Sequence, residues 1–461
     1  MPLNIKIKQQ DFQQMNGENH QIKIPMKRLL TSILLFFTLV ANIKGQSLYF
    51  PPLNNALNWD TISPSTLGWC ENKIDTLFDY LNKQDTKGFI VLKDGKIAIE
   101  KYFGTFTKDS LWYWASAGKT ITSFLVGKAQ EEKYLSIYDT TSKFLGIGWT
   151  NCTKLQEDKI NIRNQITMTT GLDDGITDNH CTADSCLKFL TSSGSRWAYH
   201  NAPYTLLEKV LENATGTSVN NYTQLKLKSK TGINGLWITS GYDNVFYSKA
   251  RAMARFGLLI QNNCVWLNDT LLYDKAYLNQ MTNTSQNLNL SYGYLWWLNG
   301  KPSYMLPGTQ FVFPGSYAPA APTDMFAALG KNGQIISVAK SLGLVVIRIG
   351  NQLDAADVTP KLCNNIWEKL NAVMCISAGV NSTQGKEVRI NIYPNPANTE
   401  LNISMHNDED FQVEIHDLLG ETILKAANKP IIDLSNYKRG VYFITISQGS
   451  LKITQKFTKT L

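Results

Sequence analysis

A serine and a lysine stand three positions apart in residues 112–119, which read Trp-Tyr-Trp-Ala-Ser-Ala-Gly-Lys. On a helix, positions i and i+3 share one face, so the Lys119 amine can reach the Ser116 hydroxyl. A serine becomes a good nucleophile only when a neighbouring group takes its proton, and a desolvated lysine can do this near neutral pH. The pair therefore predicts chemistry that proceeds through an acyl-serine intermediate.

Other pairs in the chain have the same spacing, among them Ser185 with Lys188 and Ser337 with Lys340. Ser116 differs because the segment after it keeps a helical period of apolar residues, at positions 121, 124, 125 and 129. A serine at a helix N-terminus lies where the dipole and the unpaired amides favour developing negative charge. We therefore favour Ser116. The alternative is an N-cap serine followed by an ordinary surface lysine.

The serine and lysine pair needs a further acid/base group, and a tyrosine phenol with a nearby asparagine amide could supply it. In the sequence such a motif would read Tyr-x-Asn. The pattern occurs five times, beginning at Tyr80, Tyr199, Tyr242, Tyr277 and Tyr393. Tyr199 stands out because it lies in a short polar and aromatic loop that runs directly into a predicted helix over 203–211. A loop fixed by a helix start can project Tyr199 and Asn201 into a cleft. The alternative is a turn whose tyrosine only packs on the helix.

A third candidate element is Lys-x-Gly before a strand, because a glycine lets a substrate approach and the next amide can bind an oxyanion. Lys331, Gly333 and Gln334 fit this description, since they lead into the predicted strand 335–339. Two similar patterns are less suitable. Residues 93–95 form a hairpin turn, and residues 230–232 leave a polar helix without a following strand.

Hairpins at both ends of the region would supply the frame for these residues. One spans 89–103, with Asp-Gly at its turn, and the other joins 333–339 to 343–349. Helical stretches lie between them, around 119–131, 203–213 and 249–261. The pattern predicts an α+β fold, an α/β sandwich in which an antiparallel sheet of five or more strands is flanked by helices and carries a helical subdomain.

The chain has 461 residues, of which 43% are hydrophobic, so it has room for one large domain and a smaller one. A basic start and an apolar run over 29–41 predict a signal peptide at 26–45, and the apolar run is too short for a stable membrane anchor. Residues 1–25 are a polar leader or a mis-called start. We expect a hydrolase domain over 46–376, a linker over 377–387 and a C-terminal domain over 388–461.

The seven cysteines suit an exported protein with disulfides, although an odd number leaves at least one unpaired. The first pairings to test are Cys181 with Cys186 and Cys363 with Cys375. No Cys-x-x-Cys occurs and the five histidines are scattered, so we expect neither a metal site nor a cofactor. The net charge of +8 forms no basic block, which gives little support to nucleic-acid binding.

Residues 388–461 resemble the C-terminal sorting domain of the type IX secretion system. The resemblance rests on a Tyr-Pro-Asn-Pro opening at 393–396, a Val-Glu-Ile-His-Asp strand at 413–417 and a Gly-Val-Tyr-Phe close at 440–443. It implies a small β-sandwich, the type IX machinery as partner, and export to the cell surface or the medium of a Bacteroidota-type cell. A carbohydrate-binding or immunoglobulin-like module is the alternative.

The three catalytic candidates, taken in order, resemble the superfamily of class C β-lactamases, penicillin-binding proteins and serine esterases, including the 6-aminohexanoate-dimer hydrolase branch. Residues 166–172 (Ile-Thr-Met-Thr-Thr-Gly-Leu) and 292–297 (Tyr-Gly-Tyr-Leu-Trp-Trp) match further segments, and the resemblance covers roughly 70–372. No Gly-x-Ser-x-Gly elbow of an α/β-hydrolase occurs.

The resemblance implies an acyl-enzyme hydrolase of amides or esters. It implies that Ser116 is the nucleophile, Lys119 its proton acceptor and Tyr199 the acid/base. Asn201 would hold a substrate carbonyl, and Lys331 would supply the charge that tunes Tyr199 and meets the substrate. The backbone amides of Ser116 and Gln334 would form the oxyanion hole, with Gly333 beside them.

The resemblance leaves four substrate classes possible, namely a lactam, a D-amino acid peptide, an ester and an aminohexanoate-like amide. At the position of Lys331 the lactamases and peptidases have lysine, whereas the hydrolase and esterase branch often has histidine or tryptophan. The alternative function is a catalytically silent module that binds peptidoglycan or peptides.

Overall fold

The computed structural model describes residues 48–55, 57–351, 358–376, 391–404, 410–417, 421–448 and 451–460. The predicted leader, signal peptide and linker lie outside these residues. Two compact units, Met1–Ser377 and Ala378–Leu461, make up the chain. Within the described residues, no helix combines the length and apolar character that crossing a membrane requires.

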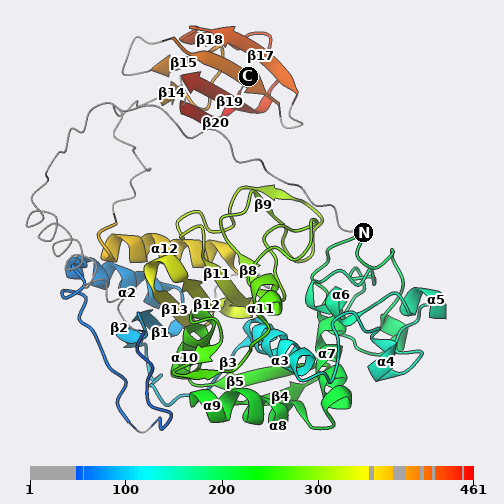
Figure 1. Ribbon diagram of the computed structural model, residues 1–461. Helices are drawn as coiled ribbons and strands as arrows, with labels where there is room; N and C mark the ends of the chain where they lie inside the picture. Colours follow the sequence, from blue (N-terminus) through cyan, green and yellow to red (C-terminus); the bar gives the residue numbers. More distant parts are fainter. Residues whose placement is uncertain are drawn as a thin grey trace, which may run out of the picture. The chain divides into compact units, whose positions relative to one another are not determined.

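A six-stranded antiparallel sheet forms the centre of the first unit, in the order β2-β1-β13-β12-β11-β8 (Figure 1). Its strands are β1 Thr86–Lys93, β2 Lys96–Tyr102, β8 Trp297–Leu298, β11 Phe326–Gly330, β12 Gln334–Ala339 and β13 Leu344–Gly350. The two ends of the unit meet where β1 pairs with β13, with Val91 opposite Val346. The predicted antiparallel sheet is confirmed.

Both predicted hairpins are present in this sheet. Asp94 and Gly95 take positive φ values of 49° and 85° between β1 and β2, as a tight hairpin turn requires. The second hairpin joins β12 to β13, with Val338 opposite Val345.

Helices cover both faces of the sheet. Helices α2 (Ile74–Lys83) and α12 (Pro360–Val373) lie on one face and α10 (Ala250–Gln261) on the other (Figure 1). A Cβ at Gly257 of α10 would lie 2.5 Å from Val345 Cγ1, so only a glycine lets the helix approach β13 this closely.

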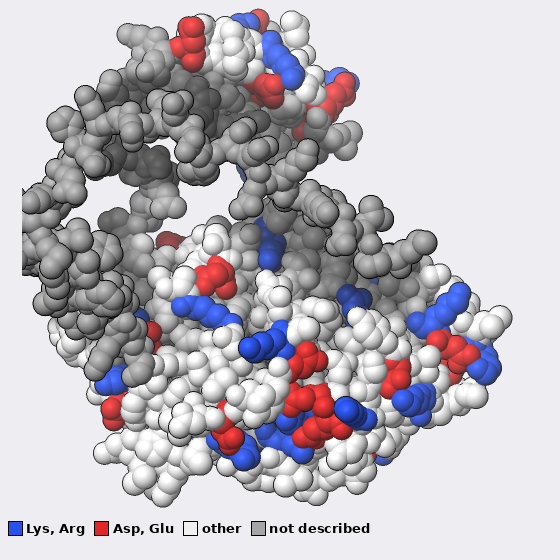
Figure 2. All heavy atoms as spheres, viewed as in Figure 1, with Lys and Arg blue, Asp and Glu red and all other residues white. Residues whose placement is uncertain are grey.

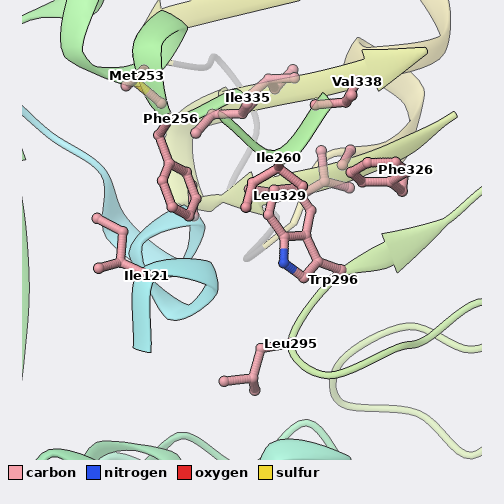
Figure 3. Packing of buried hydrophobic residues seen from close by; sticks show 14 of the residues in the cluster. Ile121, Met253, Phe256, Ile260, Leu295, Trp296, Phe326, Leu329, Ile335 and Val338 are labelled. Carbon is pink, nitrogen blue, oxygen red and sulfur yellow. The ribbon is translucent and has the colours of Figure 1, made fainter. Parts of the chain in front are cut away.

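The predicted helices are confirmed as α3 (Lys119–Glu131), α7 (Asn201–Thr215) and α10, and α7 begins two residues before the predicted start. Helix α3 is buried almost all round, and α7 and α11 (Lys275–Met281) pack against it. Figure 3 shows Ile121 of α3 near Phe256 of α10, and Trp296 near Phe326 of β11. The rings of Trp296 and Phe256 stack with centroids 6.1 Å apart.

Shorter elements complete the first unit. The helical part contains α4 Ser142–Leu145, α5 Lys154–Glu157, α6 Ile162–Ile166, α8 Val219–Thr223, a π-helical turn Gln224–Lys228, α9 Ser229–Thr231 and α11 Lys275–Met281. A second sheet has the order β3-β5-β4, formed by Trp112–Tyr113, Asp243–Ser248 and Leu236–Ser240. Two-residue strand pairs are β6 Val265–Trp266 with β7 Asp269–Thr270, and β9 Ser303–Tyr304 with β10 Phe313–Pro314.

The second unit consists of two antiparallel sheets that share one apolar core. One has the order β14-β15-β18 (Asn391–Tyr393, Glu400–Ser404, Ile431–Asp433). The other has the order β17-β16-β19-β20 (Thr422–Ala427, Gln412–His416, Gly440–Gln448, Leu451–Lys459). Side chains of both sheets fill the core, among them Leu401, Ile415, Ile432 and Ile444. The predicted small β-sandwich is confirmed.

Two disulfides are present, and one of them differs from the prediction. Cys181–Cys186 is confirmed, whereas Cys375 pairs with Cys70, so the predicted Cys363–Cys375 bond is wrong. Cys363 lies on α12 and Cys375 just past its end. Twelve residues at a helical rise span roughly 18 Å, too far for a disulfide. The Cys363 thiol instead packs against Ser337 Oγ at 3.6 Å.

Charged side chains of both signs are interspersed on the face of the molecule shown in Figure 2. Ion pairs among the described residues include Lys143 with Asp139 at 2.8 Å and Lys249 with Asp109 at 2.7 Å. No region of a single sign of charge stands out among the described residues on this face.

Candidate active site

Ser116 lies where a strand turns into the central helix. Strand β3 pairs with β5, and the Trp114 amide donates to the Phe246 carbonyl at 2.8 Å, which fixes the chain just before the serine. Ala115 then takes a positive φ of 47°, a conformation that costs an alanine free energy. A short 3-10 turn, Ala115–Gly118, leads into α3 and leaves Ser116 half-buried at the N-terminal end of that helix.

The serine and lysine pairs at 185–188 and 337–340 have different surroundings. Ser185 and Lys188 are both exposed. Ser337 is buried within β12, and Lys340 is an exposed residue beyond the end of that strand. Among the three pairs, Ser116 and Lys119 combine a half-buried serine with a lysine that is only 5% exposed.

The Lys119 amine is enclosed by groups from α7. Its Nζ donates to Asn201 Oδ1 at 2.9 Å. It also lies 3.7 Å from the centroid of the Tyr204 ring and 5.5 Å from that of Tyr199, so two aromatic faces line its surroundings. The predicted proximity of Lys119, Tyr199 and Asn201 is therefore present in the structure.

Tyr199 is buried, with 4% of its surface exposed, and is fixed by aromatic neighbours. Its ring stacks on Trp297 at a centroid distance of 6.0 Å and meets Tyr292 edge-on at 6.4 Å. Because α7 begins at Asn201, the tyrosine leaves the loop directly before the first helical turn. The phenol and the amide thus reach Lys119 from one rigid junction.

Gly330, at the end of β11, packs against the backbone around Ser116. A Cβ at this position would lie 2.5 Å from the Trp114 carbonyl oxygen and 3.2 Å from the Ser116 nitrogen. Only a glycine allows this approach. The main chain at Gly330 therefore lies beside the serine. Lys331 follows immediately and has an exposed side chain.

Gly333 and Gln334 lie deeper, beside β13 and α12. A Cβ at Gly333 would lie 2.5 Å from Arg348 Nη1 and 2.6 Å from Leu362 Cδ2. Gln334 is fully buried, and its side-chain amide donates to the Gly350 carbonyl at 2.6 Å and accepts from the Gly350 amide at 3.1 Å. Both side-chain positions therefore meet β13 and α12.

Arg348 of β13 fixes the turn between β11 and β12 through hydrogen bonds to its main chain. Its fully buried guanidinium donates to the carbonyls of Asn332 at 2.5 Å and Gly333 at 2.9 Å. Burial lowers the pKa of Arg348 to about 10. From the other side, Asn332 Nδ2 donates to the Tyr113 hydroxyl at 2.7 Å, which ties the turn to the strand before Ser116.

Sequence reasoning missed both Gly330 and Arg348. The pattern Lys-x-Gly pointed forward to Gly333, although a glycine also directly precedes the lysine. For Arg348, the available signal was a single charge inside the otherwise apolar strand 344–349.

Two further ionisable groups are buried on α7 and its cap. Burial raises the pKa of Glu208 to about 8, and its Oε2 accepts from Asn244 Nδ2 at 2.5 Å. Burial also lowers the pKa of His200 to about 4, so this ring is neutral near pH 7. Ionisable groups with strongly shifted pKa values gather more often at functional sites than elsewhere.

Comparisons with known proteins agree with this arrangement. Two solved structures share the fold, each at 16% sequence identity. One is named for a 6-aminohexanoate-dimer hydrolase, from Bacillus anthracis, with a TM-score of 0.53 over 68% of this chain and 87% of that chain. The other is named for a β-lactamase, from Bacteroides dorei, with a TM-score of 0.52 over 67% of this chain and 99% of that chain. No curated protein matches the sequence.

Two family models match the chain. Residues 391–460 match the secretion system C-terminal sorting domain, which indicates export to the cell surface or the medium. Residues 74–360, more than half of the chain, match the beta-lactamase family. The chain therefore belongs to the beta-lactamase family, whose members are generally serine hydrolases, and it carries a type IX sorting domain at its C-terminus.

Proposed function

We propose that this chain is an exported serine hydrolase that forms an acyl-enzyme on Ser116 and hydrolyses an amide or ester bond. The observation that carries the proposal is the buried amine of Lys119, one helical turn after Ser116, held by Asn201 at 2.9 Å. A buried amine gives up its proton more readily than an exposed one. Lys119 is therefore suited to accept the serine proton.

In the first step, Ser116 Oγ attacks the substrate carbonyl carbon while its proton passes to Lys119 Nζ. A carbon–oxygen bond forms, and the carbonyl oxygen becomes an oxyanion. Backbone amides are the natural donors to such an oxygen. The amide of Ser116 supplies one of them, and the packing of Gly330 against it favours the amide of Lys331 over the predicted amide of Gln334 as the second.

The intermediate then collapses with loss of the leaving group. Tyr199 donates its phenolic proton to the leaving nitrogen or oxygen and regains a proton from Lys119. For deacylation, Tyr199 passes its proton to Lys119 while it takes one from the water whose oxygen attacks the acyl carbon, and Lys119 then gives a proton to Ser116 as the ester bond breaks. Asn201 holds the amine of Lys119 through its side-chain oxygen.

Lys331 would meet the substrate from the exposed side of the site. Its charge favours substrates that carry a carboxylate, which lies near the scissile bond in lactams and D-amino acid peptides and five methylene groups away in aminohexanoate-type amides. Neutral short-chain esters would lack this contact. A panel of nitrocefin, p-nitrophenyl esters, D-Ala-D-Ala peptides and an aminohexanoate dimer would identify the substrate class.

The test of the function is covalent labelling with a fluorophosphonate probe. We expect one adduct, on Ser116, and none on Ser116→Ala. Ser185→Ala is a matched control, because Ser185 has the same spacing to a lysine but lies exposed; this variant should label as the wild type does. Folded protein that turns over none of the panel and takes no label would refute the proposal and favour a silent peptidoglycan-binding module.

A further inference from the structure

The orientation of the Asn201 amide is set by its neighbours. An ammonium or amine Nζ that donates needs an acceptor, so the oxygen of Asn201 faces Lys119, at 2.9 Å. The NH2 group therefore points the other way and needs acceptors of its own. It finds Asn179 Oδ1 and His180 Nε2, each at 3.1 Å.

His180 can accept from Asn201 only in one protonation state. Its Nδ1 lies 2.7 Å from Asp243 Oδ1, at the start of β5. A carboxylate accepts, so Nδ1 carries the hydrogen and Nε2 keeps its lone pair for Asn201. A continuous chain of hydrogen bonds thus runs from Asp243 through His180 and Asn201 to Lys119.

The loop that carries His180 is held in place by the residues directly before and directly after the histidine. The Ala202 amide of α7 donates to the Asn179 carbonyl at 2.9 Å, which joins the loop to the first turn of that helix. Directly after the histidine, the Cys181–Cys186 disulfide closes the loop. Separate covalent and hydrogen-bonded ties therefore hold the ring where it meets Asn201.

We propose that His180, oriented by Asp243, is a positioning residue that fixes the Asn201 amide so that its oxygen holds the Lys119 amine ready to take the serine proton. This role rests on the proposed function of Ser116 and Lys119. It acts through Asn201 and requires no contact between the histidine and the substrate.

The experiment measures the rate of fluorophosphonate labelling of Ser116 in the full chain. His180→Leu should label about 10- to 100-fold more slowly than wild type, as when the outer partner of a functional side chain is lost. His180→Gln keeps an acceptor oxygen for the Asn201 amide and should label within about 3-fold of wild type, a rescue that loss of packing alone would not produce.

Asp243→Ala is a second variant that leaves the histidine in place, and it should label more slowly than wild type. Asp269→Ala, which removes an exposed carboxylate paired with Lys230 at 3.2 Å, is its matched control and should label normally. Thermal melts of all variants would establish that they are folded.

Labelling of folded His180→Leu at the wild-type rate would overturn the positioning role while leaving the proposed function intact. So would a folded His180→Gln variant that labels as slowly as His180→Leu. Wild-type protein that takes no label at all would instead refute the function, and with it this role.

Discussion

The two units of the chain differ in what they bury. The first unit buries charged or ionisable side chains among its apolar residues, including Lys119, Glu208, Arg255 and Arg348. In the described part of the second unit, the core is built from alternating apolar positions such as Val413 and Ile415 of β16, and its one buried charge, Lys459, lies at the end of the last strand.

Burying an ionisable group costs free energy unless partners compensate for it. For Arg348, the hydrogen bonds that fix the turn beside Ser116 compensate for the burial of its charge. Lys119 and Glu208 lie on α3 and α7, the two helices of the candidate site, where buried ionisable groups are common. The first unit is therefore the place to look for the reaction, whereas the family model assigns export to the second.

The largest expected effect separates these two assignments. Lys119→Met should lower hydrolysis by about 10²- to 10⁴-fold, the usual contribution of a general base, while export continues. Deletion of 388–461 should do the reverse and leave an active hydrolase in the periplasm. An ester hydrolysis assay measures the catalytic activity of each variant, and fractionation of cells and medium measures its export. Normal export of the truncated chain would contradict the division of roles.

The next effect concerns the stability of each unit. Arg348→Met should lower the free energy of unfolding of the first unit by about 3 kcal/mol or more, because several buried carbonyls lose their donor. Ile444→Ala should lower that of the second unit by about 2–5 kcal/mol through a core cavity. Calorimetry should show that each variant shifts a different transition. A common shift of both transitions would mean that the units unfold as one.

The two disulfides offer a smaller contrast within the first unit. Cys70–Cys375 closes a separation of 305 residues and Cys181–Cys186 one of 5, so Cys70→Ser should lower the melting temperature more, with a loss of about 2–4 kcal/mol. Cys181→Ser should affect labelling of Ser116 more, because it releases the His180 loop. Equal effects on both measurements would contradict this distinction.

A further effect is a dependence of stability on pH. Burial raises the pKa of Glu208 to about 8, against an ordinary value of about 4.3. Between these values the folded chain keeps a proton that the unfolded chain has released, so the free energy of unfolding falls as pH rises through this window. Glu208→Gln should lack that decline. Urea unfolding from pH 5 to pH 8 tests it, with the mostly exposed Glu368→Gln as control.

Local parts of the site could be predicted from the sequence, and parts that depend on distant contacts could not. The spacing of Ser116 and Lys119 and the loop before α7 are short-range patterns, and the structure brings Lys119 to Asn201. The pairing of Cys375 with Cys70 and the approach of Gly330 to Ser116 join segments that are far apart in the chain. Periodicity carries no information about such contacts.

The sequence by itself determined the two units, the hairpins, the central helices and the candidate nucleophile with its lysine, because turn residues and apolar periods act over a few positions. Only the tertiary structure decided which glycine faces Ser116, what Arg348 supports, and that Asp243 and His180 stand behind Asn201. The physical reason is that buried polar groups must find partners, and the folded chain supplies them from wherever its packing places a donor or an acceptor.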